Sequence, residues 1–387
     1  MALIKDKIFY SYSDITIMPC EISTIEHRKE CNPLDENGML PLFTAPMDSV
    51  VGEENFEKFT EEMIYAILPR TVELSKRVEF SVKGLWSAYS LKEFENVFCN
   101  EREVLDSKGT INALIDVANG HMKKILDLVR SARNIYGDRI VLMAGNIANP
   151  LTYQQYADVG IDYLRVGIGG GNCCTTQSNT AIGCGMASLI DAVYTIKKKL
   201  ADIKVKRNGE KELRPKYSKL PKIVADGGVR NFSDIIKAIS LGADYVMIGS
   251  VFSKMIESSA VKTCTGNEWY KLPLSVRFED LTDFHLESNG WYGKYNGKDV
   301  FLGTIKATIY GMASREGQIA IGGAKTKTSE GIKKEIYVDY TMRGWCENFM
   351  DFLRSAMSYI GVRALDEMRD NAITVINSQN AIMAVNK

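Results

Sequence analysis

The sequence predicts an α/β fold, a (β/α)8 barrel with a β-hairpin and flap excursion before its C-terminal helix. Three observations favour it: eight short apolar runs rich in β-branched residues, helical patterns between them, and a glycine-rich loop after the sixth run. Apolar strands that alternate with helices are typical of a parallel sheet covered by helices. A doubly wound open sheet would carry its glycine-rich turn after the first strand, so the loop's position favours the closed barrel.

Each expected strand is a short apolar run. The eight runs are residues 41–46, 63–68, 84–89, 111–118, 139–146, 163–169, 222–228 and 245–251. Helices are expected where apolar residues recur every three or four positions. The clearest are residues 121–137, 152–160, 186–199 and 231–243. Asn231 is a suitable cap before the last of these and Gly242 a suitable end, so both limits of this helix are predicted.

Two stretches interrupt the alternation. Residues 203–221 are polar and are expected to form an exposed loop before the seventh strand, and residues 259–345 a long β-hairpin followed by a mobile flap. The final helix is expected over 346–368. Loops of this length in a compact enzyme are usually functional. We therefore expect one barrel catalytic domain over 1–387, with both excursions inserted in it.

The overall composition argues against several kinds of partner and site. Lys+Arg and Asp+Glu both number 48, and this balance argues against a nucleic-acid partner or a membrane surface, which would need a basic face. No apolar run is long enough to span a bilayer and the N-terminus has no signal-peptide core, so we expect a cytoplasmic protein. The eight cysteines show no disulfide spacing and the three histidines no zinc-binding cluster.

Polar residues and glycines gather where the strands are expected to end, on the face that carries the active site of a barrel. The sixth strand leads into VGIGGGNCCTTQSNTAIGCG, residues 166–185. Glycine lets the backbone approach a ligand, so such a loop can bind phosphate through N–H groups or a monovalent cation through carbonyls. A GxGxxG dinucleotide motif fits poorly, because Asn172 would take the third glycine's place. A cysteine here can be an inert packing residue or a nucleophile, and the residues alone leave both open.

The loop VGIGGGNCCTT resembles the catalytic loop of the IMP dehydrogenase/GMP reductase family, whose pattern is roughly G-x-G-x-G-S-x-C-T-T. PLFTAPMDSV, ALIDVANGH, MAGNIA, IVADGGVRNFSDIIKAISLGADYVMIGS and IYGMAS are similar to other family segments in the same order. The resemblance covers roughly residues 10–260 and 305–370 and also implies the barrel. It places Cys174 on the catalytic cysteine and Cys173 on the variable position before it.

The resemblance implies covalent chemistry at C2 of a purine nucleotide, with a thioimidate on Cys174 and hydride exchange with a nicotinamide cofactor. Reductases release ammonia from GMP and add hydride from NADPH to give IMP, whereas dehydrogenases oxidise IMP to XMP with NAD. Thr176 and Glu330 match the pair that protonates the departing ammonia, a transfer for which a carboxylate is suited.

The resemblance also implies the rest of the site. Asp226 is similar to the carboxylate that accepts the ribose hydroxyls. The substrate-binding positions are Met47, Asn172, Asp226, Gly227, Gly228, Gly249, Ser250, Gly311, Met312 and Ala313. The cofactor-binding positions are Asp116, Val117, Ala118, Asn119 and Asn146. The backbone carbonyls of Gly169, Gly171 and Cys174 match a potassium site, and the family suggests a homotetramer.

Several features favour the GMP reductase branch. The stretch between the third and fourth strands is too short for the CBS regulatory module of many dehydrogenases. DVANG and the short flap ending at Glu330 also resemble the reductases, and the flap lacks the Arg-Tyr pair of the dehydrogenases. A CBS-less IMP dehydrogenase and an inactive nucleotide-binding relative remain alternatives. Asn172, Gln177 and Ala45 depart from the family pattern, which leaves a deoxy or modified guanine nucleotide open as the substrate.

Overall fold

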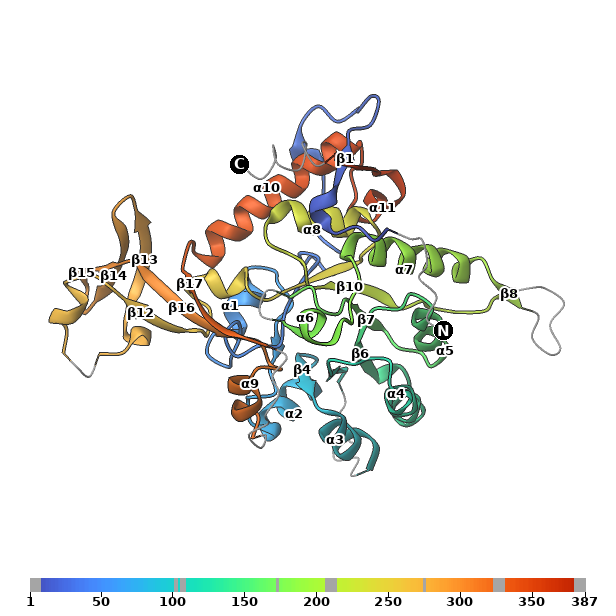
Figure 1. The fold of residues 1–387 in the computed structure, drawn as a ribbon, viewed down its shortest axis with the longest axis horizontal. Helices are drawn as coiled ribbons and strands as arrows, with labels where there is room; N and C mark the ends of the chain where they lie inside the picture. Colours follow the sequence, from blue (N-terminus) through green and yellow to red (C-terminus); the bar gives the residue numbers. More distant parts are fainter. Residues whose placement is uncertain are drawn as a thin grey trace.

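The computed structural model describes residues 8–100, 104, 109–171, 174–205, 214–273, 276–322 and 331–378. Eight parallel strands form its centre in the order β2-β11-β10-β7-β6-β5-β4-β3 (Figure 1). They are β2 (Leu42–Thr44), β3 (Ile67–Leu68), β4 (Trp86–Tyr89), β5 (Ile111–Asp116), β6 (Ile140–Ile147), β7 (Tyr163–Val166), β10 (Lys222–Asp226) and β11 (Tyr245–Ile248). A parallel bridge between Phe43 and Tyr65 joins the two ends of the sheet. The predicted barrel and its eight strands are confirmed.

Helices surround the strands on the outside of the barrel (Figure 1). They are α1 (Phe56–Glu61), α2 (Leu74–Val82), α3 (Leu91–Phe94), α4 (Lys123–Tyr136), α5 (Thr152–Asp158), α7 (Met186–Ala201), α8 (Phe232–Ser240) and α10 (Met342–Ile360). Three further helices, α6 (Thr176–Thr180), α9 (Arg315–Ala320) and α11 (Met368–Asn371), lie in the connections. The Asn231 side chain accepts a hydrogen bond from the Asp234 N–H, which confirms the predicted cap of α8.

The last helix differs from its prediction at both ends. It begins at Met342, because the Thr341 side chain accepts a hydrogen bond from the Gly344 N–H and caps it there. It ends at Ile360, because Gly361 adopts a left-handed conformation (φ 84°). The expected continuous helix over 346–368 is therefore wrong: a turn and α11 follow Gly361. Near this end, β18 (Ile373–Ile376) pairs antiparallel with β1 (Ile15–Met18).

Aromatic side chains fill the barrel interior. Phe43, Trp86 and Tyr245 are buried, and the ring centroids of Phe43 and Tyr245 lie 5.2 Å apart. Asp35 accepts hydrogen bonds from the hydroxyls of Tyr65 (2.7 Å) and Tyr245 (2.9 Å). The barrel is therefore a packed core, and it leaves the carboxyl ends of the strands for a ligand.

The two excursions contain more regular structure than predicted. The first contains a short antiparallel pair, β8 (Lys204–Val205) and β9 (Arg214–Pro215). The second contains two three-stranded antiparallel sheets instead of one hairpin. One sheet has β12 (Val261–Cys264), β16 (Ile305–Tyr310) and β17 (Lys333–Tyr337), and the other has β13 (Thr282–Glu287), β14 (Gly290–Tyr295) and β15 (Lys298–Gly303).

These two sheets, which we call the outlying sheets, extend away from the barrel (Figure 1). They share a small hydrophobic core separate from that of the barrel, with Trp291, Leu302 and Ile305 at its centre. The Trp291 Nε1–H donates to the Val338 carbonyl at 2.9 Å. A single hairpin would have had no second layer to bury these side chains, which is why the prediction of one hairpin fails. No helix in the described part of the chain is long and apolar enough to cross a membrane.

Candidate active site

A cavity of about 220 Å³ lies at the carboxyl ends of the barrel strands. Its walls come from β2, β5, β7, β10 and β11, and from the segment that follows β16. Most of the predicted site residues line it: Met47, Asp116, Gly171, Cys174, Asp226, Gly227, Gly228, Gly249, Ser250, Gly311, Met312 and Ala313. The structure therefore brings together residues that the sequence spreads over most of its length.

Cys174 lies half-buried in this cavity, just before α6. Its thiol donates a hydrogen bond to the Thr176 hydroxyl at 3.2 Å, and its N–H donates to the Gly171 carbonyl at 3.0 Å. Gly331 faces Cys174 as an antiparallel bridge, so the chain touches the cysteine loop shortly before it enters β17. The predicted site residues Asn172 and Glu330, and Cys173 as well, lie outside the described residues.

The glycines around the cysteine allow two loops to touch backbone to backbone. Gly167 has a φ of 137°, and a Cβ there would lie 2.1 Å from the Asp226 carbonyl oxygen. The Gly228 N–H donates to the Gly170 carbonyl at 2.8 Å. Only glycine tolerates such a contact at positive φ, so these residues hold the cysteine loop against the end of β10.

An ion-pair network that the sequence analysis missed connects three strands in the wall of the cavity. Arg165 on β7 is only 7% exposed, and its Nη1 lies 2.6 Å from Asp116 Oδ1. On its other side, Nη2 and Nε lie 2.8 and 3.1 Å from Asp226 Oδ2. Burial lowers the pKa of Arg165, but the carboxylates of Asp226 and Asp116 outweigh it and the net pKa is raised. In the sequence, the only sign of this network is the charged residue Arg165 within an apolar strand, because a buried charge needs a partner of opposite charge.

The predicted cofactor positions divide into two groups. Asp116 lines the cavity, whereas the Asn146 amide is directed inward and donates to Asp226 Oδ2 (2.6 Å) and to the Gly167 carbonyl (2.8 Å). The Asn146 N–H also donates to the Val117 carbonyl, which ties the end of β6 to the segment after β5. Ala118 and Asn119 are exposed beyond the cavity, and Asn119 accepts a hydrogen bond from the His121 N–H.

A second contact joins the outlying sheets to the cavity wall. The Tyr310 hydroxyl, at the end of β16, donates to Asp48 Oδ2. Asp48 follows Met47 and Tyr310 precedes Gly311, so this bond joins two opposite lining segments. Burial raises the pKa of Asp48 above its ordinary range, against the opposing effect of the Tyr310 bond, and burial also raises the pKa of Tyr310.

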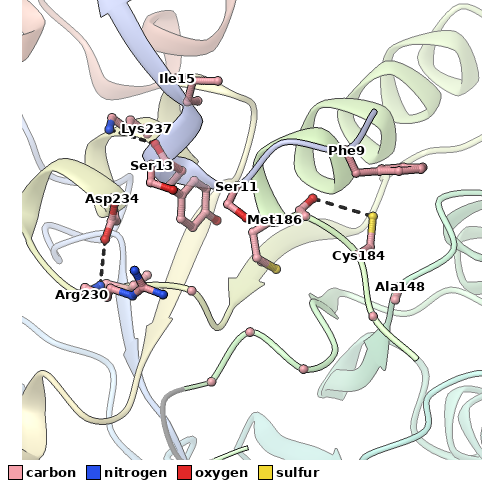
Figure 2. A pocket seen from close by; sticks show the side chains of 18 of the residues that line it. Phe9, Ser11, Ser13, Ile15, Ala148, Cys184, Met186, Arg230, Asp234 and Lys237 are labelled. Carbon is pink, nitrogen blue, oxygen red and sulfur yellow. Dashed lines mark hydrogen bonds between the residues drawn. The ribbon is translucent and has the colours of Figure 1, made fainter. Parts of the chain in front are cut away.

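A larger cavity of about 1250 Å³ lies on the other side of the glycine loops (Figure 2). Gly171, Gly228 and Val229 line both cavities, so these loops form the wall between them. The larger cavity contains Cys184, whose thiol donates to the Gly185 carbonyl at 3.7 Å and whose pKa is raised by burial. A thiol with a raised pKa is a poor nucleophile, so the geometry favours Cys174 for thiol chemistry.

Comparisons with known proteins agree with this arrangement. Residues 98–273 match the model of the IMP dehydrogenase / GMP reductase domain. The chain is 30% identical over 345 residues to a GMP reductase of Staphylococcus epidermidis, covering 86% of this chain and 96% of that protein. It is 28% identical over 347 residues to a GMP reductase of Staphylococcus aureus, with the same coverage. For a GMP reductase of Pediococcus pentosaceus the identity is 27% over 341 residues, with 85% and 95% covered.

Fold and site together define a (β/α)8-barrel protein with a cysteine loop at the carboxyl ends of its strands. This chain belongs to the IMP dehydrogenase/GMP reductase family, and it is an oxidoreductase.

Proposed function

We propose that this protein is an NADPH-dependent GMP reductase, which converts GMP or a related guanine nucleotide to IMP and releases ammonia. The observation that carries the proposal is the Cys174 thiol inside the cavity, 3.2 Å from the Thr176 hydroxyl. The backbone of Cys174 also forms a β-bridge with Gly331. The names of the curated relatives support the reductase branch.

In this reaction the Cys174 thiolate adds to C2 of the purine, and the C2 amino group leaves as ammonia. Thr176, with Glu330, delivers the proton that the departing nitrogen needs, which is ordinary general acid catalysis. NADPH supplies the hydride that replaces sulfur at C2, and Cys174 leaves as the thiolate. The closeness of the two side chains supports this assignment, because a hydroxyl in contact with the thiol is also close to the atom that the thiol attacks.

The nucleotide is held by the remaining walls of the cavity. Its phosphate meets backbone N–H groups at Gly249 and Ser250. Gly228, whose own N–H donates to the Gly170 carbonyl, borders this end, and Asn172 is assigned to the same end. A Cβ on Gly249 would lie 3.3 Å from the Met47 sulfur, so glycine keeps this end open. The remaining substrate-binding positions act at the sugar and the base. Asp226 and Gly227 contact the sugar, whereas Met47, Gly311, Met312 and Ala313 contact the base.

Asp116, Val117, Ala118 and Asn119 are the residues that would hold the nicotinamide end of the cofactor. Asn146 supports this segment, since its backbone N–H holds the Val117 carbonyl and its side chain holds Asp226. The hydrogen-bonded partners make Asn146 a positioning residue in this proposal.

The residues present fit a potassium ion at the carbonyls of Gly169, Gly171 and Cys174. The Gly171 carbonyl already accepts the Cys174 N–H, but a carbonyl oxygen has a second lone pair for a cation. Gly169 has a φ of 84°, which lets this loop turn its carbonyls sharply, and the sequence from 166 to 185 carries no charged side chain. An uncharged ring of carbonyls suits a large monovalent cation, which would hold the loop in shape.

We also propose that the whole chain acts as one catalytic domain without a CBS module, as a cytoplasmic homotetramer. Light scattering coupled to gel filtration measures the oligomeric state directly. A monomer at working concentrations would contradict the tetramer, without bearing on the chemistry.

The decisive experiment crosses GMP and IMP with the reduced and oxidised forms of both nicotinamide cofactors. We expect GMP with NADPH to consume cofactor and release ammonia in equal amounts. Cys174→Ala should abolish both signals, whereas Cys184→Ala, which alters the other cavity, serves as the matched control. NADH production from IMP and NAD would indicate the dehydrogenase alternative, and nucleotide binding without any turnover would indicate an inactive relative.

A further inference from the structure

We infer that the sugar end of this cavity accepts a 2′-deoxyguanosine nucleotide about as well as the ribonucleotide. The inference rests on the proposed function and concerns the substrate of the same site. It starts from Asp226, whose Oδ2 is already the acceptor of three hydrogen bonds, from Arg165 Nε, Arg165 Nη2 and Asn146 Nδ2. Only Oδ1 of this carboxylate is left for the sugar.

Among the described residues that line the cavity beside Asp226, those from β11 and from the segment directly after β2 carry no polar side chain. Asp226 lies beside Met247 in the register of β10 and β11, and the Ala45 N–H donates to the Ile248 carbonyl one residue further along. Met247 and Ala45 both belong to the buried interior cluster of the barrel and both line the cavity. The wall beside the carboxylate therefore consists of a thioether chain and a methyl group.

The remaining polar side chains do not replace this missing partner. Among the described lining residues they are Asp116, Arg165, Cys174 and Ser250. Asp116 is paired with Arg165 at 2.6 Å and lies at the nicotinamide end in the proposed binding mode. Cys174 is hydrogen-bonded to Thr176. Ser250 lies at the phosphate end in the proposed binding mode. Among the described side chains, recognition of the sugar thus depends on a single carboxylate oxygen.

A single acceptor has a distinct consequence for specificity. The 2′- and 3′-hydroxyls of a ribose are adjacent, so they share Oδ1, and a deoxyribose still satisfies that oxygen with its remaining hydroxyl. Strong rejection of an analogue that lacks a hydroxyl, by factors of roughly 10⁴ to 10⁵, arises when a buried polar group is left without a partner. With a 2′-deoxynucleotide bound, Oδ1 of Asp226 keeps the 3′-hydroxyl as its partner, and in this binding mode the 2′ position faces apolar atoms. We expect kcat/KM for GMP and 2′-deoxy-GMP to agree within about tenfold.

The test compares four nucleotides on the intact enzyme: GMP, 2′-deoxy-GMP, 3′-deoxy-GMP and 2′,3′-dideoxy-GMP. Loss of either the 2′- or the 3′-hydroxyl alone should change kcat/KM by no more than about tenfold. Loss of both hydroxyls should lower kcat/KM by at least about 100-fold, because Oδ1 of Asp226 is then unpaired. A loss of about 100-fold or more for 2′-deoxy-GMP alone overturns the inference.

A gain-of-discrimination variant adds a second line of evidence. Ala45→Ser introduces a hydroxyl on the apolar wall and should shift the preference towards GMP over 2′-deoxy-GMP, whereas Ala45→Val, with no polar atom, should not. If no nucleotide is reduced, the proposed function fails. The dissociation constants of the same four nucleotides are then measured by calorimetry. If 2′-deoxy-GMP binds more than about 100-fold more weakly than GMP, the inference is still overturned.

Discussion

Gly331 lies opposite Cys174 in an antiparallel β-bridge, although helices α6 to α9 and strands β8 to β16 lie between them along the chain. The bridge ties the end of the predicted flap to the cysteine loop, on the cavity side of the barrel. Since Gly331 directly follows Glu330 in the sequence, the contact supports a shared role of Thr176 and Glu330 in proton transfer. The cysteine loop and the end of the flap therefore have to be considered as one structural unit.

Removing the hydroxyl beside the thiol should slow the chemical step. We expect Thr176→Ala to lower kcat about 100-fold with little change in KM, because the proposed mechanism uses this hydroxyl in proton transfer and not as a binding contact. Steady-state kinetics with GMP and NADPH measures this. Ser178→Ala is the matched control, since Ser178 lies in the same short helix and bonds only the Thr175 carbonyl. Equal losses in both variants would contradict the assigned role.

Removing the buried guanidinium should destabilise the protein as well as the site. Arg165→Met leaves the Asp116 and Asp226 carboxylates without their shared partner, and we expect the free energy of unfolding to fall by about 3–5 kcal/mol. Urea denaturation measures the loss. Arg28→Met, which breaks the exposed pair with Asp351, should leave stability almost unchanged. Indistinguishable unfolding curves for Arg165→Met and the wild type would mean that the network is not stabilising.

A methyl group at Gly167 should force the two catalytic loops apart. The added Cβ would lie 2.1 Å from the Asp226 carbonyl, so Gly167→Ala should cost at least about 3 kcal/mol and impair nucleotide binding. Gly297→Ala is the control: its φ is also positive (75°) but nothing lies within 4 Å, so only the backbone strain of about 1–2 kcal/mol remains. A Gly167 variant no worse than the Gly297 variant would exclude the close approach.

Lys262, in β12 of the outlying sheets, should make the stability of the protein depend on pH. Burial lowers the pKa of Lys262 to about 8, against the opposing charges of Glu257, Glu279 and Glu54. The unfolded chain keeps this proton up to about pH 10.5, the ordinary value. Between these limits the unfolded state binds more protons, so stability should rise with pH. Between pH 8 and pH 10.5 the free energy of unfolding of the wild type should rise by on the order of 3 kcal/mol relative to that of Lys262→Met. Denaturant titrations of both proteins at the two pH values measure this difference. If the difference in free energy of unfolding between the two proteins stays constant over this pH range, the prediction is wrong.

The core of the outlying sheets should be separable from that of the barrel. Trp291→Ala removes a side chain that is 2% exposed, at a local cost of about 3–5 kcal/mol. We expect faster hydrogen exchange in β14 to β16 with unchanged exchange in β5 and β6, and a raised KM for the nucleotide. Tyr337→Ala, on the exposed side of β17, is the control. Faster exchange throughout the barrel would show that the two cores unfold together.

The barrel and much of its site are predictable from the sequence for a physical reason. Strands buried on both faces must be apolar runs, and a parallel barrel brings their carboxyl ends together, so Cys174, Asp116 and Asp226 are expected to meet. Arg165 was missed because one charge in the run YLRV gives no indication of which carboxylates it joins. That depends on β5 and β10 being placed on either side of it in space.

The outlying sheets were less predictable because their arrangement depends on contacts between distant residues. Alternating aromatic, lysine and glycine residues in 259–345 indicate strands, but not how they pair. Trp291 bonds Val338 across two sheets, and no local pattern encodes such a contact. The limits of the last helix were missed for a simpler reason, because the cap at Thr341 and the stop at Gly361 were outweighed by a long amphipathic pattern.

Part of the cavity wall is built on an appendage with its own small core. Gly311, Met312 and Ala313 follow directly from β16, whereas Cys174 and Asp226 are held by the barrel. If the base binds as proposed, changes in the appendage would reshape which bases fit without disturbing the Cys174 thiol. New substrates would be reached more readily through residues far from the chemistry than through those beside it.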